Sequence, residues 1–379
     1  MCPCILIIMM PTTLLAQMPN KTLVIIAISS RPYVKAAKDA GFDVIAVDAF
    51  VDQDTQAMAK QCIQVACTGH QFDAQALLRA LDAIDSADIF GVCYGAGFEA
   101  QPDLLASIGQ RFRLLGNSAD TIKASKHPEI FAAFCQANQF LTPAISMNQP
   151  SVLDDWLVKE VGGSGGAHIQ WASTYQAPLK SNQYFQQMQI GTPVSCLFLA
   201  SEQNVQVIGM NEQWVDADKH TPFKYGGAVS QIALSAHLVE TFKRFVSLAS
   251  KQFNLKGLNS VDAVVDGEQL VMLEINPRLS ATVDLYAPEK GTLMASHVSA
   301  FGIEAMPTLV LSTQSKAHHI VYAHQPVQIA KDKIWPEWVS DIPGQSQYFE
   351  IGMPICTVTS SADNVQEAKY LVQARAGII

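Results

Sequence analysis

Charged residues are scarce in this chain of 379 residues. Only 16% of the residues are Asp, Glu, Lys or Arg, whereas 49% are hydrophobic. A chain of this composition buries large cores, which excludes disordered, collagen-like and coiled-coil proteins. Internal repeats and low-complexity linkers are missing as well. At roughly 150 residues per domain, the length predicts two to three domains.

Basic residues are in deficit. The chain has 25 Lys and Arg against 34 Asp and Glu, which gives a net charge of −9 at pH 7. An acidic surface repels phosphate backbones, so we expect no nucleic-acid partner. A local basic pocket for one small phosphate compound is compatible with this charge.

A hydrophobic run of membrane-spanning length is also lacking. Residues 2–16 are apolar, but Pro11 interrupts the run, which is shorter than the ~20 residues of a spanning helix. No Lys or Arg precedes its apolar core, and this argues against a signal peptide. We therefore expect no membrane partner, a cytoplasmic protein, a translation start near Met18, and a non-functional extension at residues 1–17.

The eight cysteines include no C-x-x-C pair. Because they are scattered through a long chain, they predict reduced buried thiols, and neither a disulfide scaffold nor a zinc site. Cys2 and Cys4 form a C-x-C pair, which alone is weak evidence for a metal site.

The first third of the chain alternates between strand and helix patterns. Short apolar runs at 23–28, 42–47 and 89–94 predict strands, and residues 32–40 and 73–84 predict helices. This alternation favours a parallel sheet with helices on both faces and ligands at the carboxyl ends of its strands. Ser29–Arg31 and Gly95–Glu99 follow two of those strands. Gly95-x-Gly97 lacks the further glycine of a nicotinamide site, which leaves a plain turn or a substrate contact.

Later segments predict further elements. A helix is expected over residues 128–138, with Ile130, Phe131, Phe134 and Cys135 on one stripe, and another over 235–251. Residues 156–161 predict a strand, and 183–200 predict two. Residues 257–276 predict a hairpin, because Asp266-Gly267 separates two strand-like runs.

Polar side chains end the second strand of this hairpin. Glu274 and Asn276 are two residues apart and therefore face the same side of a strand, which Asp262 on the partner strand can share. Two carboxylates and an amide oxygen suit Mg²⁺, with Mn²⁺ as the alternative, bound together with phosphate oxygens. Arg278 adds a planar cationic fork beside those phosphates. The structural alternative is a solvated strand face followed by a turn at Asn-Pro.

A lysine and a glycine-rich segment precede this hairpin. Lys159 lies in an apolar strand, where a charge is costly unless an anion pairs with it. Gly162, Gly163, Ser164, Gly165 and Gly166 follow, and their N–H groups suit phosphates. The segment is not a P-loop, because no Gly-Lys-Ser/Thr follows. Its alternative interpretation is a flexible linker.

The order of these elements resembles that of the ATP-grasp superfamily of carboxylate–amine ligases. The resemblance implies a first ATP lysine at Lys126, with Lys123 as the rival, and a second at Lys159 before the flap of residues 162–166. It also implies an adenine hinge at Gln186, Gln187, Met188 and Gln189. Asp262, Glu274 and Asn276 would hold the metal, and Arg278 would follow them. The glutamate with which many members hold the ribose is missing, since Gln187 and Pro193 stand at the expected places.

The resemblance covers residues 18–379 and implies an α/β fold of ATP-grasp architecture. We expect a Rossmann-like parallel-sheet domain at 18–120, a small lid subdomain at 121–190, a large subdomain at 191–310 and a C-terminal β element at 311–379. The lid and the large subdomain would clamp the nucleotide.

The resemblance further implies a ligase that uses ATP and Mg²⁺. ATP would phosphorylate a small-molecule carboxylate, and an amine would attack the acyl phosphate to give an amide, ADP and phosphate. Lys159 and Arg278 would act in catalysis. His168 has two alternative interpretations: it is a structural residue, or it approaches the phosphates. The loop 94–99 resembles the branch that couples glutamate to tyramine-like amines in one-carbon cofactor biosynthesis. A biotin-carboxylase-like or purine-pathway enzyme and a non-catalytic ATP sensor are the alternatives, and a homodimer stays open.

Overall fold

A four-stranded parallel sheet forms the N-terminal part of the chain, as the β-α alternation predicted. The computed structural model describes residues 21–286, 291–302, 309 and 311–379, so the predicted extension 1–17, with Cys2 and Cys4, lies outside it. The strand order is β3-β2-β1-β6. The elements of this part are β1 (Thr22–Ile26), α2 (Arg31–Asp39), β2 (Asp43–Asp48), α3 (Gln53–Met58), β3 (Gln61–Gln64), β4 (Cys67–Thr68), β5 (Gln71–Phe72), α4 (Ala74–Asp82), β6 (Ile89–Tyr94) and α5 (Pro102–Arg111).

The central strand β1 is buried along its whole length, which explains why its sequence is apolar without alternation. It pairs in parallel with β2 on one side and with β6 on the other. Residues 29–31 follow β1 and residues 95–99 follow β6, so both segments lie at the carboxyl edge of this parallel sheet.

A small antiparallel sheet follows, with the order β7-β10-β8-β9. It lies beside two helices, of which α7 begins at Pro128, where a missing N–H costs no helical hydrogen bond. The elements are α6 (Ala119–Lys126), α7 (Pro128–Ala137), β7 (Ile145–Ser146), β8 (Trp156–Glu160), β9 (Gln170–Trp171) and β10 (Gln183–Gln187).

The largest sheet has eight strands in the order β15-β14-β11-β12-β13-β16-β20-β18. The predicted hairpin is confirmed: β14 and β15 pair antiparallel, with Asp266 opposite Gln269 and Gly267 at φ +57° in the turn. This part comprises β11 (Thr192–Ala200), β12 (Val205–Val215), β13 (Tyr225–Ser230), α8 (Ala236–Phe253), β14 (Gly257–Asp266), β15 (Gln269–Asn276), α9 (Val283–Tyr286) and α10 (Thr292–Ser299).

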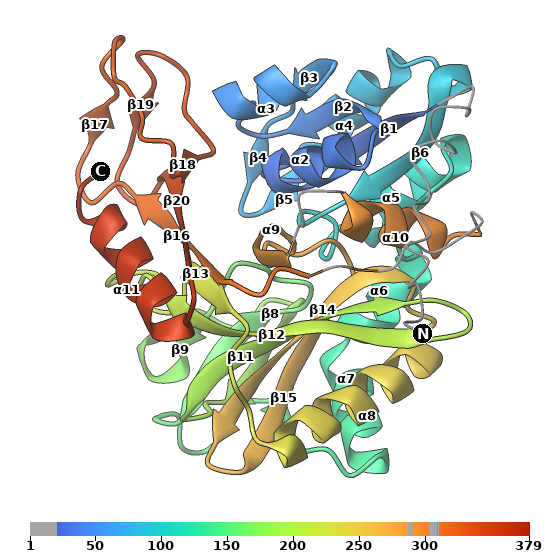
Figure 1. Cartoon of the computed structure of the whole chain (residues 1–379). Coiled ribbons are helices and arrows are strands. Elements are labelled where there is room, and N and C mark those ends of the chain that lie inside the picture. The colour runs from blue at the N-terminus through green and yellow to red at the C-terminus, as the bar shows by residue number, and fades with distance from the viewer. Residues whose placement is uncertain (1–20, 287–290, 303–308, 310) are drawn as a thin grey trace, which may run out of the picture.

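The C-terminal strands extend this same sheet. β16 pairs with β13 and β20 pairs with β16, so strands of the predicted C-terminal β element at 311–379 belong to the large sheet. Helix α11 packs on β16 and β20 at one end of the molecule (Figure 1). The elements are β16 (Ser315–Tyr322), β17 (Val327–Gln328), β18 (Val339–Ser340), β19 (Tyr348–Phe349), β20 (Pro354–Ala362) and α11 (Val365–Ala376).

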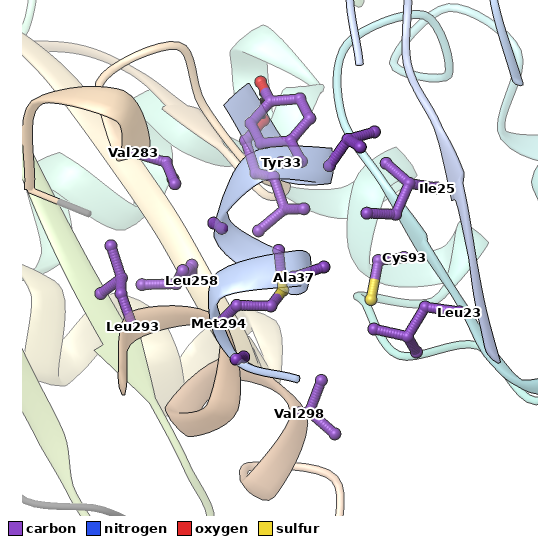
Figure 2. Close-up of a cluster of buried hydrophobic side chains, with 14 of the residues drawn as sticks. Leu23, Ile25, Tyr33, Ala37, Cys93, Leu258, Val283, Leu293, Met294 and Val298 are labelled. Carbon is purple, nitrogen blue, oxygen red and sulfur yellow. Dashed lines mark hydrogen bonds between the residues drawn. The ribbon is translucent and has the colours of Figure 1, made fainter. Parts of the chain in front are cut away.

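Helix α2 joins the N-terminal sheet to the large sheet through one apolar core. Figure 2 shows Tyr33 and Ala37 of α2 between Leu23 of β1 on one side and Leu258 of β14 and Met294 of α10 on the other. These side chains are at most 4% exposed. Because this one core is packed between the two sheets, it fixes the position of each sheet relative to the other.

A second core holds α7 and α8 against the large sheet. Phe131, Phe134 and Cys135 of α7 are buried in it, as predicted, and pack near Phe245 of α8. Ile130, predicted on the same stripe, is 43% exposed and is not part of this core. In the part of the chain that the structure describes, no helix combines the length and apolarity needed to cross a membrane.

Candidate active site

A cavity of about 1470 Å³ lies where the three larger sheets meet. Typical small-molecule sites have about 300–1,000 Å³, so this cavity has room for a nucleotide together with a second molecule. Most of the residues that the sequence predicted for the site line it: Lys159, Ser164, Gly165, Gly166, Gln186, Gln187, Met188, Asp262, Glu274, Asn276 and Arg278.

The hairpin β14–β15 brings three oxygen-bearing side chains to one face. Asp262 and Glu274 stand opposite each other in the register of the two strands, and Asn276 is two residues beyond Glu274. Asn276 Nδ2 donates to Asp262 Oδ2 at 2.7 Å, which leaves Asn276 Oδ1 directed elsewhere. The predicted oxygen set is therefore gathered in space and faces the cavity.

Two buried lysines from other elements reach this set. Lys126, the last residue of α6, has its Nζ 3.2 Å from Glu274 Oε2 and 3.5 Å from Asn276 Oδ1. Lys159, in β8, has its Nζ 3.9 Å from the same Glu274 oxygen. Gly162 and Lys126 share a smaller pocket that adjoins the main cavity through Glu274.

Lys123, the rival for the first lysine, points away from the cavity. Its Nζ pairs with Asp103 Oδ1 at 2.7 Å, and its side chain is 50% exposed. Lys126, at the end of α6, is only 4% exposed, so the two lysines lie in different environments although they are three residues apart. The geometry favours Lys126.

The charges of the site set the pKa values of its acids. Burial alone would raise the pKa of Glu274, but the ammonium groups of Lys126 and Lys159 lower it to about 2. Burial, and then the neighbouring Glu274 carboxylate, raise the pKa of Asp262. Burial opposes the charge of Lys159 too, yet Tyr184 and Glu274 raise its pKa above the ordinary value. Glu274 and Lys159 are thus charged at neutral pH.

Arg278 is held by a residue of the N-terminal part. Its Nε donates to Glu99 Oε1 at 2.8 Å, and Glu99 Oε2 accepts the N–H groups of Gly97 and Phe98. The predicted loop 95–99 therefore orients the arginine through Glu99, a role that the sequence analysis missed. The signal available was a single acidic residue in a loop after a strand, which is not specific.

The glycine segment 162–166 packs closely against its neighbours. Gly162, Gly165 and Gly166 have φ values of +74°, +69° and +74°, which favour glycine. A Cβ on Gly166 would collide with the carbonyl oxygen of Phe223, and one on Gly162 with the carbonyl oxygen of Glu99. Tyr225 N donates to Gly165 O at 2.9 Å. The segment, called the glycine cover below, is in contact with both the N-terminal part and the large sheet.

The predicted hinge lies at the edge of the cavity. Gln186 is buried, and residues 186–189 line the cavity wall. The N–H groups of Gln187 and Met188 donate to the carbonyls of Ala144 and Asp155, both at 2.8 Å, and this fixes the backbone. Their carbonyl oxygens and side chains are the groups through which the segment can contact a base.

His168 and Lys224 enlarge the candidate site. Neither ring nitrogen of His168 has a hydrogen-bond partner, and burial, with the charge of Lys159, lowers its pKa to about 4. A Cβ on Gly163 would collide with this ring. Lys224 lines the cavity with its Nζ 4.0 Å from the centre of the Tyr322 ring and 3.2 Å from Asp218 Oδ2. The sequence analysis missed Lys224, because a lone lysine in a loop carries no pattern.

The oxygen set fits a magnesium ion. The Lys126 ammonium lies against Glu274 Oε2 and Asn276 Oδ1, so these oxygens already attract a cation. No cluster of three or more His, Cys, Asp or Glu side chains suited to a metal occurs among the described residues. Two carboxylates with an amide oxygen are the smaller set that Mg²⁺ uses when phosphates complete its coordination.

Comparisons with known proteins agree with this geometry. Residues 124–282 match a family model described as the ATP-grasp domain. A search of curated proteins found no match to the chain. The L-amino acid ligase of Bacillus licheniformis has a similar structure, with a TM-score of 0.68 and 12% identity over 94% of this chain and 97% of that chain.

Two further solved structures share the fold. The biotin carboxylase domain of the Hydrogenobacter thermophilus 2-oxoglutarate carboxylase, in complex with MgADP, ADP and bicarbonate, has a TM-score of 0.69 and 11% identity over 93% of this chain and 89% of that chain. The N5-carboxyaminoimidazole ribonucleotide synthetase of Thermotoga maritima has a TM-score of 0.65 and 12% identity over 94% and 98%. Residues 124–282 therefore match an ATP-grasp domain, as the sequence motifs predicted, and the chain shares the fold of these three proteins.

Proposed function

We propose that this protein is an ATP-dependent ligase that joins a carboxylate to an amine through an acyl phosphate. One observation carries the proposal: Lys159 and the oxygen set on β14–β15 line a single cavity that extends to loops of the N-terminal sheet, and Lys126 reaches the same Glu274 oxygen from the adjoining pocket. Such a cavity suits a reaction between a nucleotide and a second substrate, because both need to lie in one enclosed space.

The charged and polar residues of the site would have different roles in this reaction. Lys126 and Lys159 would hold the phosphates, and the N–H groups of residues 162–166 would cover them. Asp262, Glu274 and Asn276 would hold Mg²⁺, which when bound neutralises charge on phosphate oxygens. Arg278, oriented by Glu99, would stabilise the negative charge that develops on the acceptor.

The proposed reaction has two steps. A carboxylate oxygen of the first substrate attacks the terminal phosphorus of ATP, and ADP leaves. The nitrogen of the amine then attacks the acyl carbon, phosphate leaves, and the nitrogen loses a proton to give the amide. Neither step needs a nucleophilic side chain, so positioning and charge are what the protein supplies.

We propose glutamate as the first acid to test, since the loop 94–99 resembles that of glutamate-coupling ligases in cofactor biosynthesis. The L-amino acid ligase of Bacillus licheniformis, which has a similar fold, supports amino acids as the wider class. The MgADP in a second similar structure supports ATP and Mg²⁺ as the co-substrate and metal.

The test is ADP formation by the purified protein with ATP and Mg²⁺, over a matrix of amino acids and primary amines, with mass spectrometry for the amide. We expect ADP and one amide in equal amounts for at least one pair. ADP formed only with bicarbonate would replace the ligase by a carboxylase or purine-pathway reaction. ATP binding without ADP formation over the whole matrix would favour an ATP sensor.

A further inference from the structure

Acidic side chains gather around Arg31 at the end of the cavity next to α2. They come from β2 and α3 of the N-terminal part, from α9, and from the turn after β18, so distant parts of the chain build this end together. The carboxylates are those of Asp48, Asp52, Asp54, Asp284 and Asp341. Among them, Asp52, Asp284 and Asp341 line the cavity, as Arg31 does.

The guanidinium of Arg31 is already engaged. Its Nη1 donates to Asp284 Oδ2 at 2.8 Å and its Nε donates to Asp341 Oδ1 at 3.0 Å. Its side chain is only 6% exposed. Arg31 is therefore satisfied by carboxylates of the chain, and this end of the cavity does not offer it to an anionic substrate.

The neighbouring carboxylates Asp48 and Asp54 are engaged as well. Asp48 Oδ2 accepts the Ser30 hydroxyl at 2.5 Å, and its Oδ1 accepts the N–H groups of Phe50 and Val51. Asp54 accepts the N–H groups of Asp341 and Ile342, both at 2.9 Å. These two acids hold the local backbone and have a structural role.

Asp52 differs from its neighbours. It is 7% exposed, and its Oδ2 is buried without a hydrogen-bond partner. An aspartate that precedes a helix normally accepts a bond from the first turn, but Asp52 makes no such bond to α3. Burial, and then the charges of Asp341, Asp48 and Asp54, raise its pKa to about 8. A buried carboxyl group that faces a cavity without a partner is costly, and a cation bound beside it removes that cost.

We propose that this end of the cavity binds an ammonium group of the substrate, with Asp52 as its ion-pair partner and Asp341 nearby. The inference rests on the proposed function and deepens it, because it assigns the amine substrate to the N-terminal end of the same cavity. An ammonium group suits the site better than a metal ion, since no metal-like cluster of acids occurs among the described residues.

The surroundings of Asp52 suit an amine that carries an apolar stem. Ile28, Pro32, Tyr33 and Phe50 line the same end of the cavity. An ammonium group on an alkyl or aryl chain satisfies both kinds of surface, because its charge meets Asp52 and its stem meets the apolar wall.

The test is binding without ATP, so that it is independent of turnover. Isothermal titration would compare n-butylamine with 1-butanol and phenethylamine with 2-phenylethanol, which differ in the charged group. We expect at least one amine to bind the wild-type chain about tenfold or more tighter than its alcohol. D52N, which keeps the shape of the side chain and removes its charge, should remove this advantage, whereas D103N on the exposed α5 should retain it.

Three outcomes would overturn the proposal: no amine binds better than its alcohol, the advantage survives in D52N, or Mg²⁺ alone binds at Asp52 and no amine does. If D52N does not fold, D52S is a second uncharged variant, because serine also begins helices. The comparison of amines with alcohols on the wild-type chain can refute the proposal without any variant. Failure of the ligase assay with intact amine binding would refute the proposed reaction and leave this subsite in place.

Discussion

Lys126 and Glu274 form an ion pair where the main cavity adjoins the smaller pocket, with Lys126 Nζ 3.2 Å from Glu274 Oε2. Lys159 approaches the same oxygen from another sheet. One carboxylate thus joins α6, β8 and β15 before any nucleotide arrives. When phosphates bind, the lysines gain new anionic partners, and Glu274 becomes free to hold a cation.

The first prediction concerns Glu274. E274Q keeps the size of the side chain but removes the charge that attracts Mg²⁺, so turnover with Mg²⁺ should fall by about 100-fold or more. The fold should persist, because the Glu274 side chain is 27% exposed and the amide that replaces its carboxylate keeps an oxygen that can accept a hydrogen bond from Lys126. ADP formation at increasing Mg²⁺ would measure the loss, and circular dichroism would check the fold.

The matched control for this variant is E129Q, on an exposed face of α7. Its turnover should equal that of the unmodified protein. Undiminished turnover in E274Q would show that the metal is held elsewhere.

The second prediction separates the two lysines of α6. Lys126→Met keeps the apolar stem and removes the buried ammonium, so the KM for ATP should rise by about tenfold or more. Lys123→Met removes an exposed ammonium that pairs with Asp103, and such surface pairs contribute little, so its KM should change less than twofold. Steady-state kinetics on both variants would decide, and a larger effect at Lys123 would reverse the assignment of the first ATP lysine.

The third prediction tests the close packing of the glycine cover. Gly166→Ala should reduce kcat/KM about tenfold or more, because its Cβ would collide with the Phe223 carbonyl and displace residues 162–166. Gly267→Ala is the control: it also has positive φ, but nothing lies within 4 Å of the added Cβ. Its cost should be about 1 kcal/mol of unfolding free energy, with kcat/KM unchanged. Equal kinetic losses in both variants would mean that backbone strain, and not the collision, is responsible.

Local patterns explain why the metal hairpin could be predicted from the sequence. Asp266-Gly267 marks the turn, and the two-residue period of a strand then places Glu274 and Asn276 on one face. Ser235 begins α8 by accepting the N–H of Leu238, which is again a local signal. Each of these features depends on residues that are close in sequence.

Contacts between distant segments could not be predicted in this way. The bond from Arg278 to Glu99 joins residues 179 positions apart, and that from Arg31 to Asp341 joins residues 310 apart. No periodicity relates such pairs, because they meet only when the two sheets pack through α2. For the same reason, the sequence could not predict that β16 and β20 extend the large sheet, or that Asp52 lacks a hydrogen-bond partner for its Oδ2.

The last prediction concerns stability and pH through His297, which is 2% exposed beneath β14. Its Nδ1 accepts the Leu258 N–H at 2.9 Å and its Nε2 lies 2.8 Å from the Leu115 carbonyl, an arrangement that requires the neutral ring. Burial lowers its pKa from 6.5 to about 4, so between these values the unfolded chain binds the extra proton. The unfolding free energy should therefore decrease as pH falls from 6.5 toward 4, by up to about 1.4 kcal/mol per pH unit from this residue.

Urea unfolding of H297Q at pH 7, 6 and 5 should show a shallower decrease, because glutamine donates and accepts without titrating. The exposed H237Q variant should retain the original slope, and an unchanged slope in H297Q would refute the assignment.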